Sequence, residues 1–210
     1  METKIKVITL GDMGVGKTSI IGRIRDGKFS NKYQATINFD VFSKKKTYEK
    51  KKITFSLIFY DTIGQERYQN LMPETYIRDS HVVLLVFSDL DTLDVLKKRW
   101  YNFYKKNANV ENSRFIVVGN KSDEFGDNRD EILKQGQQFA DELDAHFITC
   151  SAKCEDNMDN LERYITTEAK RFIDENEKIY KNANKKVKLV YDSDYILNDP
   201  KNQEQKRKCC

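Results

Sequence analysis

Gly11-Asp12-Met13-Gly14-Val15-Gly16-Lys17-Thr18 is the stretch that decides the fold, and it fits the pattern G-x-x-x-x-G-K-[ST]. The residues before it, Lys4 to Leu10, alternate in hydrophobicity and predict a buried strand, while isoleucines at helical spacing predict a helix from Lys17 to Asp26. A glycine-rich turn between a strand and a helix lets backbone N–H groups surround phosphate oxygens, and the helix adds unpaired amides and the positive end of its dipole. The sequence therefore predicts a phosphate-binding loop.

Side chains of this loop carry the chemistry expected for a polyphosphate with a metal ion. Lys17 offers a positive charge to the β- and γ-phosphates, and the Thr18 hydroxyl is a ligand for Mg²⁺. Asp61, at the end of another predicted strand, is placed to hold the metal through water. We expect the nucleotide to contact Asp12, Met13, Gly14, Val15, Gly16, Lys17, Thr18 and Ser19.

The rest of the chain alternates between strand and helix patterns. Two strand-like runs joined at Glu49–Lys51 read as an antiparallel hairpin, and Val82–Phe87 is fully apolar, which is typical of a central parallel strand. The predicted strands are Asp40–Tyr48, Lys52–Tyr60, Val82–Phe87, Arg114–Gly119 and His146–Thr149, and the predicted helices are Gln65–Arg78, Leu93–Lys106, Arg129–Leu143 and Asn157–Glu175. This order implies an α/β fold with a six-stranded, mostly parallel sheet, one antiparallel hairpin strand and helices on both faces.

A second motif selects the base. Asn120-Lys121-Ser122-Asp123 follows the Arg114–Gly119 strand, and the Asp123 carboxylate can accept two hydrogen bonds from the N1–H and the exocyclic amine of guanine. Adenine offers no such pair, so a site of this kind rejects it by roughly 10⁴-fold. Ser151, Ala152 and Lys153 follow the last strand and are expected to support the base from the other side.

A third motif, Asp61-Thr62-Ile63-Gly64-Gln65, supplies groups for hydrolysis. The N–H of Gly64 can reach the γ-phosphate, and Gln65 can orient the attacking water. Gln65 is therefore the predicted catalytic residue.

Together these segments resemble the Ras-like small GTPases, and the resemblance covers residues 4–176. Within that superfamily the chain is similar to the Rab family in Asp61–Arg67 (DTIGQER), in Tyr33–Ile37 (YQATI) and in the pair Cys209-Cys210. YQATI and Tyr76–Ser80 are similar to the Rab branch that works at the Golgi. The resemblance implies a P-loop NTPase fold (a Ras-like G domain), GTP or GDP bound with Mg²⁺, and slow hydrolysis of GTP unless an activating protein assists.

The resemblance also assigns roles to residues near the loop. Thr36 would reach Mg²⁺ and the γ-phosphate when GTP is bound, Tyr33 would contact the nucleotide, and Phe29 would lie against the guanine, unless it is an ordinary core or surface aromatic. Residues Lys32–Phe42 and Ile63–Ile77 would form the two switch segments, which the γ-phosphate orders and hydrolysis releases.

Some residues depart from the family pattern, and they leave an alternative open. Ile63 stands where nearly all relatives have alanine, beside the phosphate, and Asn38, Val41 and Tyr60 replace the usual residues of the switch region. A β-branched side chain at position 63 predicts slow intrinsic hydrolysis. A GTP-locked membrane scaffold that hydrolyses poorly is therefore the alternative to a cycling switch, whereas a small-molecule kinase would not need the guanine motif.

The charge of the chain is concentrated at its C-terminal end. Residues 178–210 contain nine Lys/Arg and four acidic residues, a net charge of +5 in a chain whose total is +4. We expect a GTP-binding domain over residues 1–177 and a flexible basic tail over 178–210 that favours an anionic membrane. Cys209 and Cys210 resemble the doubly geranylgeranylated ends of Rabs, although unmodified exposed thiols are the alternative.

The resemblance further implies the partners and the location. A Rab would meet effectors, an exchange factor, an activating protein, a prenylation escort and a dissociation inhibitor, and it would cycle between the cytosol and the cytoplasmic face of Golgi or endosomal membranes. We expect a monomer that does not bind nucleic acid, because the domain shows no basic face studded with aromatic residues.

Composition excludes other classes of protein. The chain has no apolar run near the ~18 residues of a membrane span, and no signal-peptide core at its N-terminus. Four cysteines, two of them adjacent, form no disulfide framework and fit a reducing compartment. Cys150 and Cys154 lack the further ligands of a zinc site, and Trp100 is predicted to be a packing residue.

Overall fold

The computed structural model describes residues 3–30, 40–61 and 77–176, and the elements below belong to one compact unit, Glu2–Glu175. The predicted tail lies outside the described residues, as does the predicted helix Gln65–Arg78 up to residue 76.

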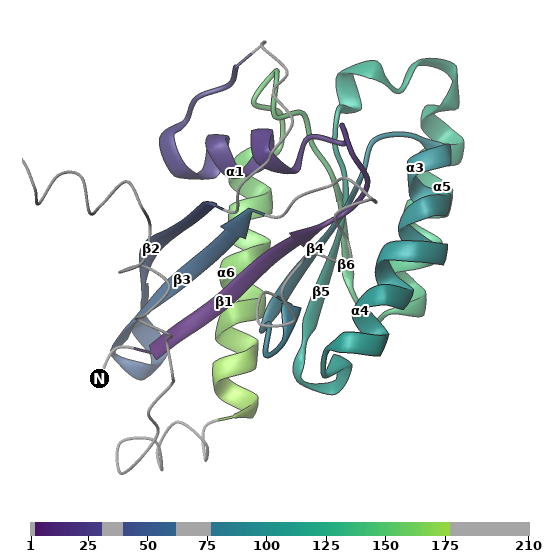
Figure 1. Cartoon of the computed structure of the whole chain (residues 1–210). Coiled ribbons are helices and arrows are strands. Elements are labelled where there is room, and N and C mark those ends of the chain that lie inside the picture. The colour runs from purple at the N-terminus through teal and green to yellow at the C-terminus, as the bar shows by residue number, and fades with distance from the viewer. Residues whose placement is uncertain (1–2, 31–39, 62–76, 177–210) are drawn as a thin grey trace, which may run out of the picture. The chain divides into compact units, whose positions relative to one another are not determined.

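Six strands form a single sheet, as predicted (Figure 1). Their order is β2-β3-β1-β4-β5-β6; β2 and β3 pair in antiparallel fashion and all other neighbours are parallel. The strands are β1 (Thr3–Leu10), β2 (Asp40–Tyr48), β3 (Ile53–Asp61), β4 (Val82–Phe87), β5 (Arg114–Gly119) and β6 (His146–Thr149). Every residue of β4 is buried, because helices cover both of its faces.

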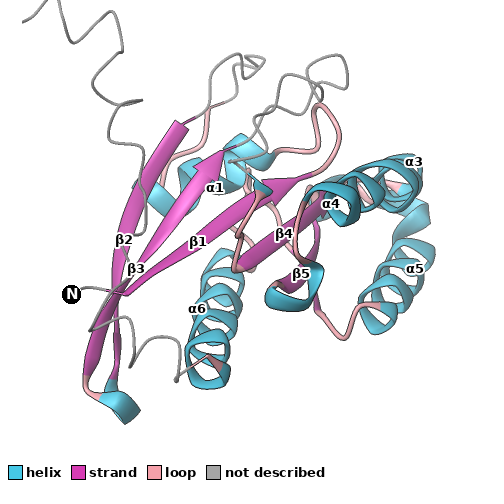
Figure 2. Cartoon of the chain, turned by 60° about the horizontal axis from the view of Figure 1, so that its bottom comes forward, coloured by secondary structure: helices cyan, strands magenta, loops and turns pink. Residues whose placement is uncertain are grey.

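Helices cover the sheet on both sides (Figures 1 and 2). On one side lie α1 (Lys17–Asp26) and α6 (Met158–Glu175), which contact each other. On the other lie α3 (Leu90–Val95), a π-helical segment (Leu96–Tyr101), α4 (Asn102–Asn107) and α5 (Arg129–Glu142). None of the helices in the described ranges is long and apolar enough to cross a membrane.

The helix predicted at Leu93–Lys106 differs from the observed one in two ways. It begins earlier, at Leu90, because Asp89 and Thr92 form a capping box: Asp89 Oδ1 accepts the Thr92 N–H at 2.8 Å, and Thr92 Oγ1 accepts the Asp89 N–H at 3.0 Å. It is also not α-helical throughout, since the π-helical segment interrupts it.

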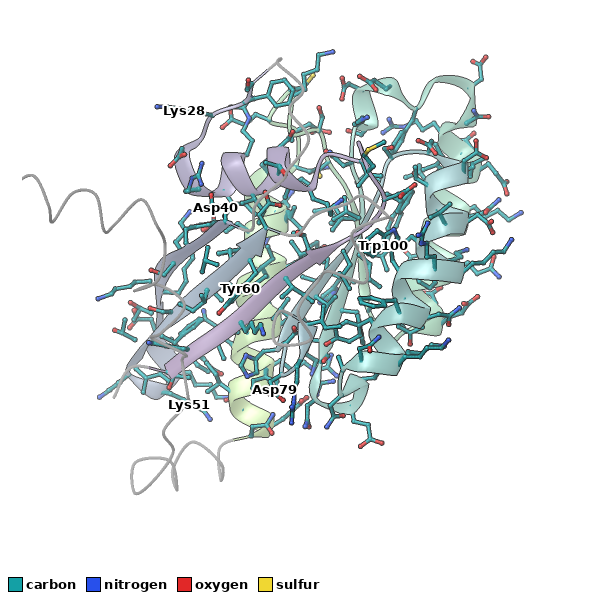
Figure 3. All side chains as sticks on the ribbon, viewed as in Figure 1. Lys28, Asp40, Lys51, Tyr60, Asp79 and Trp100 are labelled. Atoms are coloured by element: carbon teal, nitrogen blue, oxygen red, sulfur yellow. The ribbon has the colours of Figure 1, made fainter. Side chains whose placement is uncertain are left out.

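Trp100 lies in that π-helical segment, and its side chain is fully buried, as predicted (Figure 3). It belongs to a core cluster with Leu85 and Phe87 of β4 and with Phe139 of α5. The cluster fixes the helices of this face against the sheet.

The parallel strands β1, β3, β5 and β6 end at one edge of the sheet, where the loops that carry the sequence motifs begin. This carboxyl edge is where open α/β sheets bind their ligands.

Candidate functional site

The turn between β1 and α1 needs two of its glycines for space. A Cβ on Gly11 would lie 2.1 Å from the carbonyl oxygen of Val86, and a Cβ on Gly16 would lie 2.2 Å from Asn120 Nδ2. Gly16 also has φ +93°, in the left-handed region that favours glycine. The neighbouring strand end and Asn120 therefore set the shape of the phosphate loop.

Lys17 spans the inside of this turn. Its ammonium donates hydrogen bonds to the carbonyl oxygens of Gly11 at 2.9 Å and Asp12 at 2.7 Å. Burial lowers the pKa of Lys17 to about 8, although Asp61 and Asp12 favour the charged form. A polyphosphate beside this ammonium would raise its pKa again, because a neighbouring negative charge favours the protonated form, so the site is electrostatically suited to an anion.

The start of α1 adds a second feature that suits an anion. Gly16 is the N-cap residue and provides no side-chain cap. The first amides of the helix and the positive end of its dipole therefore face the turn.

Asp61, at the end of β3, has the environment expected of a metal-binding carboxylate. The residue is only 2% exposed, and burial raises its pKa, while a hydrogen bond from Thr18 and the charge of Lys17 act in the opposite direction. Its Oδ1 is buried and has no hydrogen-bond partner among the described residues, and the same holds for Asp12 Oδ1. A buried carboxylate with an unpaired oxygen next to a hydroxyl fits a hydrated Mg²⁺ ion, which would neutralise phosphate charge when bound.

Asn120, just after β5, joins three segments of the site. Its Nδ2 donates a hydrogen bond to the carbonyl oxygen of Val15 at 2.8 Å, and its Oδ1 accepts one from the Ala152 N–H at 3.2 Å. The Cys150 thiol lies 3.7 Å from the same Oδ1, which places Cys150 next to the base-side loop. The phosphate loop and both predicted base-binding loops are thus held by one side chain.

Asp123 is held ready by the loop that follows β6. Ser151 Oγ donates a hydrogen bond to Asp123 Oδ1 at 2.6 Å and accepts one from the Cys154 N–H at 3.0 Å. The Lys153 ammonium lies 3.7 Å from Asp123 Oδ2. The hydrogen bond from Ser151 is the main reason that the pKa of Asp123 lies below its usual range. An ionised carboxylate at this position can accept hydrogen bonds from a guanine edge.

The remaining predicted site residues fall into two groups: those that the structure describes and those that lie outside the described residues. Lys121 has left-handed backbone geometry (φ 60°), Met13 is exposed, Ser19 lies on the first turn of α1, and Phe29 lies under the guanidinium of Arg23. Tyr33, Thr36, Gly64, Gln65, Cys209 and Cys210 lie outside the described residues, as do Asn38 and Ile63.

Sequence reasoning missed Arg23, which contacts the backbone of the loop after β6. No motif contains this residue. The only available signal was its position on the helix that begins at the phosphate loop.

Comparison with known protein families supports the interpretation that the geometry suggests. Residues 6–171 match the model of the family described as "Ras family", a range that includes the phosphate loop, Asp61, the Asn120–Asp123 segment and the Ser151–Lys153 segment. The chain therefore belongs to the Ras family, the small GTPases that bind GTP and GDP with Mg²⁺ and act as switches.

Proposed function

We propose that this protein is a Rab-type switch that binds and hydrolyses GTP and recruits effectors to an intracellular membrane during vesicle transport. The observation that carries the proposal is the stretch Asp61–Arg67 (DTIGQER), which resembles the Rab form of this motif and retains Gln65. Tyr33–Ile37 (YQATI) and the pair Cys209-Cys210 support it. Golgi or endosomal membranes are the proposed location.

Surface near the nucleotide site supports effector binding. Val41 of β2 is 46% exposed, and it stands where Rabs usually present an aromatic residue to effectors. Arg25 of α1 pairs with Asp40 and lies 5.9 Å from the ring centroid of Phe42, so the residues on either side of Val41 contact the helix that begins at the phosphate loop. A partner at this surface would therefore contact a segment tied to the nucleotide site.

Membrane attachment would come from the tail. Two lipid chains, or one chain with a basic patch, hold a protein firmly on a bilayer, and Lys206, Arg207 and Lys208 precede the two cysteines. Expression of the full chain in eukaryotic cells, followed by membrane fractionation, tests this: the parent protein should sediment with membranes and a Cys209→Ser/Cys210→Ser variant should remain in the cytosol. Equal distribution of the two proteins would contradict lipid attachment at these residues.

Intrinsic hydrolysis is proposed to be slow because of Ile63, and an arginine supplied by an activating protein could add on the order of 10³–10⁵ in rate. Single-turnover GTP hydrolysis by the parent and by Ile63→Ala tests the first point. The variant should be faster, and rates that agree within about twofold would show that the isoleucine does not crowd the site.

The GTP-locked scaffold remains a second candidate because of the same residue. HPLC of nucleotide released from the purified protein separates the two: bound GDP supports the cycling switch, and bound GTP supports the scaffold.

A further inference from the structure

Arg23 connects α1 to the loop that follows β6. Its Nε donates a hydrogen bond to the carbonyl oxygen of Ala152 at 2.7 Å, and its Nη2 donates one to the carbonyl oxygen of Lys153 at 3.0 Å. In Figure 1 this loop (green) lies beside α1 (purple). Only 14% of the Arg23 side chain is exposed; its hydrogen bond to Ala152 is partly buried, and its hydrogen bond to Lys153 lies at the surface.

The opposite edge of the same loop holds the residues that are expected to bind the base. The Ala152 N–H donates to Asn120, and the side chains of Ser151 and Lys153 contact Asp123. Arg23 therefore fixes the carbonyl side of a short segment whose amide and side chains orient both base-motif residues. A displacement of that segment would change the geometry at Asp123.

The same guanidinium also reaches the segment after α1. Its Nη1 donates a hydrogen bond to the carbonyl oxygen of Gly27 at 2.7 Å, and its carbon lies 5.9 Å from the centroid of the Phe29 ring. Phe29 is the aromatic residue that the family resemblance places against guanine. One side chain thus holds two segments that would flank the base.

Glu155 contributes little to this arrangement. It lies 3.4 Å from Arg23 Nη1, but its own side chain is 66% exposed, and ion pairs with an exposed partner are weak. The three carbonyl contacts need donors that point in different directions, which a planar guanidinium has and a lysine ammonium on a flexible stem does not.

We propose that Arg23 is a positioning residue for the guanine base: it holds the loop Ser151–Lys153 and Phe29 in their binding geometry and thereby limits the rate at which GDP leaves. The proposal concerns guanine-nucleotide binding and does not depend on the chain being a Rab.

Release of a ribose-labelled fluorescent GDP from the full chain, with Mg²⁺ present, tests the proposal. Arg23→Met removes every donor and keeps a long side chain, and Arg23→Lys keeps one ammonium. Arg171→Met makes the same change near the C-terminal end of α6, where the guanidinium contacts Asp144 and Glu175. Glu155→Gln removes only the ion pair. We expect GDP release to be about tenfold faster in Arg23→Met, the factor that corresponds to losing one hydrogen bond made by a charged group. Arg23→Lys should lie between this variant and the parent, and both controls should remain close to the parent.

Two further readouts separate positioning of the base from loss of structure. Labelled inosine diphosphate (IDP) lacks the exocyclic amine that would donate a hydrogen bond to Asp123. The ratio of the IDP release rate to the GDP release rate therefore reports base recognition. Arg23→Met should bring this ratio closer to one. Acceleration of release by EDTA reports the metal end of the site and should be unchanged. The proposal is overturned if Arg23→Met releases GDP within twofold of the parent rate, or if it accelerates GDP and IDP by the same factor. Should Arg23→Met not fold, Arg23→Lys takes its place, and the proposal is overturned if this variant changes the release rates of GDP and IDP by the same factor.

Discussion

The side-chain amide of Asn120 donates a hydrogen bond to the carbonyl oxygen of Val15 across 105 positions of sequence. Asn120 is nearly inaccessible to solvent, and its Nδ2 occupies the space that a Cβ on Gly16 would need. The segment expected to recognise the base therefore also supports the turn expected to bind the phosphates. This contact therefore holds the two ends of the nucleotide site together.

Gly16→Ala should weaken GDP binding much more than Gly14→Ala does. Both residues have positive φ, so both substitutions introduce backbone strain, but only position 16 places the new methyl against Asn120. Among the described residues no atom lies within 4 Å of a Cβ at position 14. Strain plus displacement of a buried hydrogen bond corresponds to a loss of affinity on the order of a hundredfold for Gly16→Ala. Isothermal titration of both variants with GDP measures this, and equal losses would show that the contact with Asn120 is unimportant.

Ser151→Ala should lower the affinity for guanine nucleotides. The substitution removes the donor at 2.6 Å from Asp123 Oδ1, and it leaves that carboxylate less well oriented and its pKa closer to the usual value. We expect a loss of about tenfold in GDP affinity, the equivalent of one such hydrogen bond.

Ser122→Ala is the matched control for that substitution. Ser122 is also buried next to the site, but its hydroxyl lies 3.3 Å from Asp156 and not against Asp123. Its GDP affinity should stay near that of the parent. A control that loses as much affinity as Ser151→Ala would indicate a general effect on the loop.

The sequence predicted the strands better than the helices, for a physical reason. Val82–Phe87 and Arg114–Gly119 agree with the structure at both ends, because a short apolar run in a parallel sheet is marked by composition alone. The helix over α3 and α4 was predicted with the wrong start and without its π-helical segment. Hydrophobic periodicity averages over several turns, so it does not report one extra residue in a turn.

The candidate site was predictable as a set of loops but not as a network. Motif spacing identified Lys17, Asp61, Asn120 and Asp123, and the fold brings the ends of their strands to one edge of the sheet. The contact of Asn120 with Val15 and the contacts of Arg23 with Ala152 and Lys153 join residues more than 100 positions apart. Such pairings depend on tertiary packing, which no local pattern encodes.

Tyr104→Phe should destabilise the fold modestly. The Tyr104 hydroxyl lies 2.7 Å from Ser113 Oγ in the buried core, and Ser113 Oγ also bonds the carbonyl oxygen of Ser80 at 2.9 Å. Because Ser113 keeps that second partner, the free energy of unfolding should fall by only about 1 kcal/mol. Urea unfolding measures it, with the fluorescence of Trp100, the single tryptophan of the chain, as the probe. A loss several times larger would mean that the hydroxyl also supports contacts of the helix itself.

Stability should fall in acid because His81 is held neutral. Its Nδ1 accepts a hydrogen bond from the backbone N–H of Lys6 at 2.7 Å, and its ring centroid lies 4.5 Å from that of Phe172. Burial lowers the pKa of His81 from 6.5 to about 4. The Lys6 ammonium acts in the same direction, and Asp79 acts in the opposite direction. Between these two pH values the unfolded chain binds a proton that the native protein does not bind. The free energy of unfolding therefore decreases as the pH falls from 6.5 to 4, by a total on the order of 3 kcal/mol, and this contribution is fully retained above pH 6.5.

Urea unfolding at a series of pH values with saturating GDP and Mg²⁺ tests this prediction. His81→Asn retains an acceptor near the Lys6 N–H but does not titrate, so its stability should decline less steeply than that of the parent between pH 6.5 and 4. His146→Gln is the matched control, because His146 is the other of the two histidines in the chain. Its Nε2 lies 3.0 Å from Glu168 Oε1 and does not face the backbone of β1. The control should keep the acid sensitivity of the parent. If His81→Asn and the parent lose stability equally over this range, protons taken up elsewhere cause the loss, and the buried imidazole is not the acid-sensitive group.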